Sequence, residues 1–296
     1  MPSARLPERS VIALTGESVF SFLQNIITAD MDDIDRLGIG YSALLTPQGK
    51  VICDFFVMTA DDGYRIDVAQ TAADTLIKRL TLYRLRAKVE IAARPDLAVW
   101  VAWGEDAVVP EKAVADPRLA GLGYRWIAAE DGEPAPAEAS DWHAWRIAHG
   151  LPEGGVDFPF DDSFPHDAAL DALGAIAFDK GCYIGQEVVS RMRHRGTARR
   201  RIVTVTGEGA LPEAGAEILA AGNPIGRLGS SSGDTGIAVV RLDRLEKAVA
   251  ADQPVEAGAV RLQVSLPDWA TYGWPSQAAQ GQSGGSENGD TEPAAS

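Results

Sequence analysis

The apolar pattern of this chain changes near Arg201, and the change limits what the chain can fold into. After Arg201, apolar and polar residues alternate over 203–206, and the alternation returns over 260–265. A period of two is typical of β-strands, and Gly-rich turns separate the apolar stretches. Residues 201–266 are therefore predicted to form a small all-β domain, either a barrel or a compact sandwich.

The first 200 residues instead mix helix and strand signals. Apolar residues at i, i+3, i+4, i+7 and i+8 predict a helix over 19–27, and a second amphipathic helix is expected over 71–83. Two apolar stretches flank the turn at 46–50, whose proline and glycine favour a β-hairpin. Further short elements are expected as strands over 64–68 and 97–103 and as a helix over 142–148. This part is therefore predicted to be α+β.

Composition divides the chain further. Residues 128–140 are rich in proline, alanine and acids without periodicity, which is typical of a surface linker. Residues 267–296 end in a stretch without large apolar side chains, so they are expected to form a disordered tail. The predicted order is an α+β part over 1–127, the linker, a second part over 141–200 and the all-β domain.

The overall composition excludes several classes of protein. The 296 residues carry 27 basic and 42 acidic side chains, a net charge of −15, which argues against a DNA-binding protein. No apolar run approaches the roughly 18–20 residues of a membrane span, and no secretory signal is expected at the start. Two cysteines cannot build a disulfide framework, which favours a reducing compartment and a cytoplasmic location.

One short segment reverses the overall charge. Residues 191–201 contain six arginines, one histidine and no acid. A local basic strip on an acidic protein indicates an anionic ligand or partner. For any single arginine the alternative stays open that it lies on a solvated face or pairs with a nearby carboxylate. An RNA-binding role is disfavoured, because the strip contains no aromatic side chain on which a base could stack.

The most distinctive segment is 180–187, Lys-Gly-Cys-Tyr-Ile-Gly-Gln-Glu. A reactive thiol needs positive charge or backbone donors nearby, and Lys180 lies two residues from Cys182. Gly181 and Gly185 would let the backbone turn sharply or approach a ligand closely. The alternative is that Cys182 is a buried structural cysteine.

This eight-residue segment resembles the signature of the YgfZ family. Those folate-binding proteins are related to the glycine-cleavage T-protein, an aminomethyltransferase, and their mitochondrial relatives act in iron–sulfur cluster assembly. Segments 22–30, 45–50, 145–152 and 216–230 are also similar to the family, so the resemblance covers about residues 8–266. It implies a T-protein-like (GcvT-like) α+β folate-binding fold with a C-terminal β-barrel.

The resemblance also implies a function and partners. The implied function is that of a tetrahydrofolate-binding accessory factor in the assembly or repair of iron–sulfur proteins. Cys182 in a cationic pocket would be its catalytic residue, together with Lys180. The alternative is a folate-dependent one-carbon transferase of the aminomethyl type. Implied partners are folate and iron–sulfur client or assembly proteins, and an indirect link to tRNA modification is left open.

The implied cofactor is tetrahydrofolate or a one-carbon derivative. Its anionic glutamate tail would meet the basic strip, and its pterin would meet the amide of Gln186 and the carboxylate of Glu187. The residues expected to bind it are Asn25, Asp30, Gln48, Gly49, Lys50, Gly181, Tyr183, Gly185, Gln186, Glu187, Arg191 and Arg195.

One departure from the T-protein pattern bears on catalysis. T-proteins carry an Asp-Asp pair after the hairpin turn, where this chain has Cys53 and Asp54. Acid–base catalysis needs a placed ionisable group, so ordinary glycine-cleavage activity is not expected. Asp54 is either a ligand group or the cap of a strand end. No resident metal is expected, because the histidines lack zinc-site spacing and two cysteines cannot supply the four ligands of a 4Fe–4S cluster.

Overall fold

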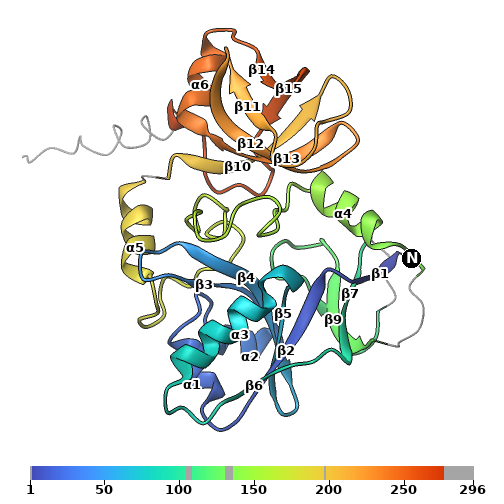
Figure 1. Ribbon diagram of the computed structural model, residues 1–296, viewed down its shortest axis with the longest axis vertical. Helices are drawn as coiled ribbons and strands as arrows, with labels where there is room; N and C mark the ends of the chain where they lie inside the picture. The colour runs from blue at the N-terminus through green and yellow to red at the C-terminus, as the bar shows by residue number, and fades with distance from the viewer. Residues whose placement is uncertain (1, 105–108, 131–135, 197, 277–296) are drawn as a thin grey trace, which may run out of the picture.

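The computed structural model describes residues 2–104, 109–130, 136–196 and 198–276. Two antiparallel sheets fill one end of the molecule, and a barrel lies at the other (Figure 1). The larger sheet has the order β3-β4-β5-β2-β6, and the smaller has the order β1-β7-β9-β8. Their strands are β1 Ser3–Leu6, β2 Arg9–Thr15, β3 Ile39–Leu45, β4 Val51–Ala60, β5 Gly63–Ala69, β6 Glu90–Ala93, β7 Leu97–Ala102, β8 Val114–Ala115 and β9 Tyr124–Ala129.

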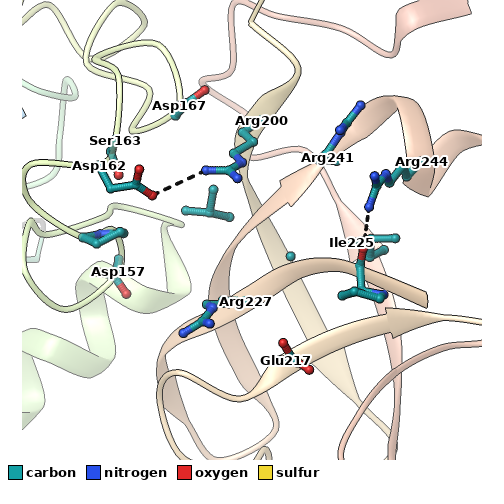
Figure 2. A pocket seen from close by; sticks show the side chains of 14 residues that line it. Asp157, Asp162, Ser163, Asp167, Arg200, Glu217, Ile225, Arg227, Arg241 and Arg244 are labelled. Carbon is teal, nitrogen blue, oxygen red and sulfur yellow. Dashed lines mark hydrogen bonds and ion pairs between the residues drawn. The ribbon is translucent and has the colours of Figure 1, made fainter. Parts of the chain in front are cut away.

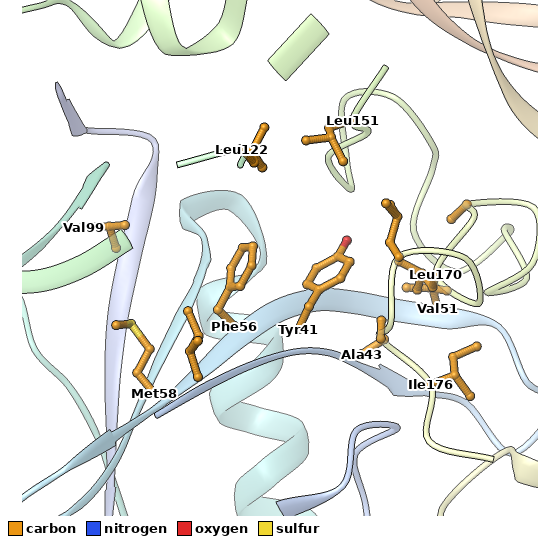
Figure 3. Close-up of a cluster of buried hydrophobic side chains, with 14 of the residues drawn as sticks. Tyr41, Ala43, Val51, Phe56, Met58, Val99, Leu122, Leu151, Leu170 and Ile176 are labelled. Carbon is orange, nitrogen blue, oxygen red and sulfur yellow. The ribbon is translucent and has the colours of Figure 1, made fainter. Parts of the chain in front are cut away.

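The larger sheet is covered on both faces, and its central strand shows how. In β4 the first eight residues are all buried. Because side chains alternate along a strand, Phe55 and Val57 pack on the side of α1 and α3, whereas Phe56 and Met58 pack on the opposite side. That second cluster also holds Tyr41 and joins the two sheets (Figure 3). The helices of this part are α1 Val19–Gln24, α2 Met31–Leu37, α3 Gln70–Arg84, α4 Ala139–Ala148 and α5 Gln186–Arg195.

The predicted β-hairpin is confirmed. β3 and β4 pair antiparallel, and the turn between them is closed by the Thr46 amide donating to the Lys50 carbonyl at 2.8 Å. Gly49 has φ +77°, a left-handed conformation that glycine adopts without strain. The predicted helix near residue 19 ends at Gln24, earlier than expected, because Ile27 already bridges to Leu44 of β3.

The predicted barrel is confirmed as well. Its six strands close in the order β10-β13-β12-β11-β14-β15 around an apolar core, and one helix packs on it. The elements are β10 Arg200–Gly207, β11 Glu217–Ala220, β12 Asn223–Ser232, β13 Thr235–Arg241, α6 Leu242–Ala250, β14 Val255–Ala257 and β15 Val260–Ser265. Irregular chain between α4 and α5 separates the barrel from the sheets (Figure 1).

Two expected irregular segments are partly regular. In the expected linker 128–140, Ala128 and Ala129 end β9, because they pair with β7, and a capping box formed by Glu138 and Asp141 starts α4. Residues 131–135 of the linker lie outside the described residues.

The first part of the expected tail is also ordered. Its aromatic side chains pack on the protein, since the Trp269 indole donates to the His149 carbonyl and the Tyr272 hydroxyl donates to the Ile202 carbonyl, both at 2.8 Å. The prediction for 267–276 was wrong because the lack of large apolar side chains holds only for the later residues of the expected tail. Residues 277–296 lie outside the described residues.

Candidate functional site

The distinctive segment 180–187 forms a loop that leads into α5, and Lys180 fastens it to the protein. The ammonium of Lys180 donates to the carbonyls of Ile27 at 3.1 Å and Ala29 at 2.6 Å. Burial lowers the pKa of Lys180 to about 8, and the nearby carboxylate of Asp30 opposes that shift. Lys180 therefore connects the loop to the segment that contains Ile27 and Ala29. Within the described residues it makes no hydrogen bond or ion pair with Cys182, so its predicted catalytic role stays a prediction.

The two cysteines lie in opposite environments. Cys182 is exposed, and the position of Gly181 beside it faces open space. Cys53 is fully buried in the helix-side core, where burial, followed by the charges of Asp54 and Asp161, raises the pKa of its thiol. The alternative that Cys182 is a buried structural cysteine is therefore wrong, and it is Cys53 that fits that description.

Tyr183 is the buried member of the loop. Its ring packs in the apolar cluster between the sheets, with the Lys180 ammonium 5.6 Å from the ring centroid. The buried hydroxyl of Tyr183 has no hydrogen-bond partner within the described ranges, and burial raises its pKa to about 12. The buried side chains of Lys180 and Tyr183 thus hold the loop in place, and the exposed thiol of Cys182 lies between them in the sequence.

The hairpin turn packs directly on the start of α5. A β carbon at Gly185 would lie 2.7 Å from the Thr46 carbonyl oxygen, and one at Gly49 would lie 2.8 Å from the Val188 side chain. Both glycines have positive φ, so this contact between two sequence motifs depends on glycine on both sides. Sequence segments more than 130 residues apart therefore form one surface.

The basic strip is divided between a helix and a strand. The Arg191 guanidinium donates to Glu187 at 2.5 Å on the exposed face of α5, and Arg193 stacks 3.9 Å from the Phe178 ring centroid. Arg201 donates to Asp171 at 2.9 Å, and Arg200 forms an ion pair with Asp162 at 3.8 Å. The alternative of pairing with nearby acids therefore applies to Arg191, Arg200 and Arg201. The helix for 186–195 was not expected from the sequence. Most of the strip nevertheless stays exposed.

Two adjoining clefts separate the barrel from the rest of the protein. The smaller has a volume of about 510 Å³, and the larger about 570 Å³. In the smaller, the Lys50 ammonium lies 3.7 Å from the Phe164 ring centroid and 3.8 Å from a carboxylate oxygen of Asp162. The lining of the smaller cleft is completed by Asp167, Val188, Met192, Ala198, Arg199, Arg200 and Arg241.

Only part of the expected folate set faces these clefts. Lys50 lines the smaller one, whereas Asn25 donates to the Ser21 carbonyl and Asp30 caps α2. Gln48 is exposed at the hairpin tip, Gln186 begins α5 half-buried, and Arg195 is exposed near the end of α5. The structure thus brings the hairpin, the loop and α5 together but does not arrange all of the expected residues around one cavity.

A buried charge network at the centre of the protein was not predicted. Asp67 accepts from the guanidinium groups of Arg9 and Arg125, each at 2.6 Å, and Arg118 pairs with Asp116 at 2.8 Å. The three guanidinium groups lie 4.1–5.9 Å from the centroid of the Phe56 ring. Charged residues inside otherwise apolar strands were the signal, but their partners come from distant segments.

Asp54 belongs to the same region. It lies within β4, buried, and accepts from the Tyr41 hydroxyl at 2.7 Å, so the prediction that it caps a strand end is wrong. Burial raises the pKa of Asp54, although Arg9 and the Tyr41 hydrogen bond lower it. Cys53, its neighbour, points to the opposite face of the sheet.

Arg146 links this network to the barrel. From α4 it donates to Asp157 at 2.8 Å and to the hydroxyl of Ser230 in β12 at 2.7 Å. The other carboxylate oxygen of Asp157 accepts from the Ser230 amide at 2.6 Å. Burial raises the pKa of Glu153, but the charges of Arg146 and Arg9 outweigh burial and bring it to about 2.

No group of three or more His, Cys, Asp or Glu side chains placed to hold a metal ion occurs in the described residues. No helix in the described part of the chain combines the length and apolarity needed to cross a membrane.

The sheets, the coil and the barrel together define a protein with the aminomethyltransferase fold. The chain is similar to the glycine cleavage system aminomethyltransferase T from Bartonella henselae, with a TM-score of 0.68 over 90% of this chain and 86% of that chain, at 16% identity. Residues 199–272 match the family described as CAF17, C-terminal beta-barrel domain. These matches confirm the predicted T-protein-like fold with a C-terminal β-barrel.

Within this class, the chain belongs to the family of iron–sulfur cluster assembly factor IBA57 homologues. It is 33% identical to the mitochondrial IBA57 homologue of Phaeosphaeria nodorum, over 82% of this chain and 70% of that protein. It is 28% identical to mitochondrial IBA57 of Homo sapiens, over 92% of this chain and 85% of that protein. The narrower resemblance to the YgfZ family stays a prediction. The relatives are named as mitochondrial proteins, so they contradict the expectation of a cytoplasmic location.

Proposed function

We propose that this protein is an accessory factor in the assembly or repair of iron–sulfur proteins and that Cys182 is its working thiol. The observation that carries the proposal is the exposed Cys182 on a loop fixed by Lys180, in a chain of this family. Thiolates are the usual protein ligands of iron–sulfur clusters. The cluster is cargo here, because one accessible thiol cannot hold it alone.

The surroundings of Cys182 suit such cargo. The helix α5 begins at Gln186, four residues after Cys182, and it carries the exposed cations Arg193 and Arg195. Thiolate-bound clusters and acidic partner surfaces are both negative, so this helix attracts them although the whole chain is acidic. The remaining cluster ligands would come from a partner protein, since Cys53 is buried.

Deletion of the gene tests this proposal. The 4Fe–4S enzymes of the deleted strain should lose most of their activity, while enzymes without clusters keep theirs. A Cys182→Ala protein expressed to the wild-type level should not restore the 4Fe–4S enzymes. Normal cluster-enzyme activity in both strains would contradict the proposal.

We also infer that the protein binds tetrahydrofolate or a one-carbon derivative, in the smaller cleft beside the hairpin. Three features support this fit. The volume of about 510 Å³ lies in the range of small-molecule sites, Phe164 offers an aromatic face, and Lys50 and Arg200 offer cations for the glutamate carboxylates. Bound there, folate would bring its one-carbon chemistry beside α5. The residues of this chain would hold it and orient it.

Calorimetric titration of the purified chain tests the folate site. We expect a Kd in the micromolar range, about −8 kcal/mol, that Lys50→Gln weakens about tenfold. Cys182→Ala should leave binding nearly unchanged, because Cys182 acts chemically rather than as a contact. Absence of binding, or equal binding by Lys50→Gln, would remove this part of the proposal.

One observation keeps the transferase alternative in view. Asp54 is a buried carboxyl whose pKa is raised by burial, and such groups serve as acids or bases. Turnover of methylene transfer between a small amine and tetrahydrofolate, lost in Asp54→Asn, would make this the better account.

A further inference from the structure

The larger cleft, of about 570 Å³, is not used by the function proposed above. One wall is the irregular chain that precedes α5, and the other is the barrel (Figure 2). The barrel wall presents four arginines, Arg200, Arg227, Arg241 and Arg244, from three strands and a helix. The remaining lining residues are Asp157, Pro159, Asp162, Ser163, Asp167, Glu217, Pro224, Ile225, Gly226 and Val239.

Two of the four arginines on the barrel wall have no acidic partner in the described part of the chain. Arg227 is exposed and makes no ion pair or side-chain hydrogen bond with the described part of the chain, and Arg244 donates to the neutral carbonyl of Pro224 at 2.8 Å. Arg200 forms a long ion pair with Asp162, at 3.8 Å (Figure 2). Arg241 is paired as well, because Asp243 accepts two hydrogen bonds from it.

Two acids of the opposite wall do not pair with these arginines. Asp157 is already engaged by Arg146 and by the Ser230 amide. Asp167 is buried and accepts from the Phe164 amide, and burial raises its pKa. Glu217, on the barrel wall, is exposed and has no ion pair within the described ranges, so the cleft presents two unpaired arginines, Arg227 and Arg244, against this one carboxylate.

The lining of the cleft is partly apolar. It includes Pro159, Ile225 and Val239, and a cavity of this size holds a small organic molecule rather than a single ion. Arginine forks bind carboxylate and phosphate oxygens through two parallel hydrogen bonds. We propose that this cleft is a binding site for a small organic molecule that carries two or more carboxylate or phosphate groups.

The neighbouring cleft suggests which molecules could supply such anionic groups. The two clefts share Asp162, Asp167, Arg200 and Arg241, so a ligand that extends from one enters the other. A chain of γ-linked glutamates, the tail of a folate, is one source of suitable carboxylates, and the phosphates of a free nucleotide are the other. The polyanion site requires neither folate binding nor Cys182, so it stands or falls separately from the proposed function.

Calorimetry on the full chain tests the site, with tri-γ-glutamate, ADP and inorganic phosphate as probes at constant ionic strength. We expect tri-γ-glutamate or ADP to bind with a Kd below about 100 µM, and the probe that binds identifies the source. Arg227→Gln and Arg244→Gln lie on different elements, and each should weaken binding about tenfold. Arg36→Gln, on the exposed face of α2, is the matched control and should not change it.

Several outcomes would overturn the inference. The first is that neither organic probe binds, and the second is that inorganic phosphate alone binds. The third is that Arg36→Gln weakens binding as much as Arg227→Gln does. Since Arg227 and Arg244 are both exposed, thermal unfolding of the two variants should match that of the wild type. A loss of binding by only one of them would also contradict a ligand that spans the barrel wall.

Discussion

Gly185 at the start of α5 packs against Gly49 of the β-hairpin so closely that a β carbon at Gly185 would lie 3.2 Å from the Gly49 α carbon. The loop that carries Cys182 therefore rests on the hairpin at one end and is tied by Lys180 at the other. This arrangement gives an exposed thiol a fixed position on a surface built from three distant segments.

Substitution of Gly185 should show how much this contact contributes. Gly185→Ala introduces a β carbon at a positive φ and 2.7 Å from the Thr46 carbonyl oxygen, so we expect a loss of about 2 kcal/mol or more in unfolding free energy. Gly181→Ala is the control, because its β carbon meets open space, and it should cost less than about 1 kcal/mol. Urea denaturation measures both. Equal stability of the two variants would refute a close contact between hairpin and helix.

The environments of the two thiols predict a selective modification. Iodoacetamide should modify the native protein once, at exposed Cys182, whereas Cys53 should react only in denaturant, because it is buried and its pKa is raised. Mass spectrometry of the intact protein and its peptides reads out both sites. Native Cys182→Ala serves as the control and should stay unmodified. Rapid native modification of Cys53 would contradict the assignment of Cys53 to the core.

Removing the charge of Asp67 should destabilise the centre of the protein. Asp67→Asn leaves Arg9 and Arg125 buried without their shared carboxylate, which is expected to cost about 3–5 kcal/mol. Asp33→Asn breaks an exposed ion pair instead and should change stability by less than about 1 kcal/mol. Chemical denaturation distinguishes them. A small effect at Asp67 would mean that the network contributes little to the fold.

Glu153 predicts a pH dependence of stability. Its pKa falls from 4.5 to about 2 on folding, so its charge stabilises the protein above pH 4.5, and this contribution is lost as the pH falls towards 2. Glu153→Gln should be less stable than the wild type by about 3 kcal/mol at pH 6. By pH 3 the difference should be about half as large.

The matched control for this pH profile is Glu256→Gln, at an exposed position of β14. Its stability should follow that of the wild type at every pH. Urea denaturation across the pH range gives both curves. A difference between wild type and Glu153→Gln that stays constant with pH would show that the charge of Glu153 is not responsible.

Local patterns predicted much of the fold, and distant pairings limited the rest. The turn at 46–50 and the strands after Arg201 follow from residues close in the chain, and both are confirmed. The role of Lys180 could not be predicted, because its acceptors lie about 150 residues earlier. The arginines of the basic strip looked alike in sequence, yet Arg201 pairs with Asp171 while Arg200 faces a cleft.

The buried network shows the same limit. Arg9 and Asp67 lie on neighbouring strands of the larger sheet, and Arg125 reaches Asp67 only when the smaller sheet packs against it. The spacing of residues along one segment carries no information on such partners. The segment 267–276 was misjudged for a related reason, since Trp269 and Tyr272 donate to carbonyls that lie far away in the sequence.

The most direct test of the central claim is the activity of 4Fe–4S enzymes in a strain that lacks this gene and expresses one variant at the wild-type level. Cys182→Ala should leave those enzymes as inactive as no complementation does. Cys53→Ala, which removes the buried thiol, should restore them whenever it accumulates as folded protein. Full restoration by Cys182→Ala would contradict the account.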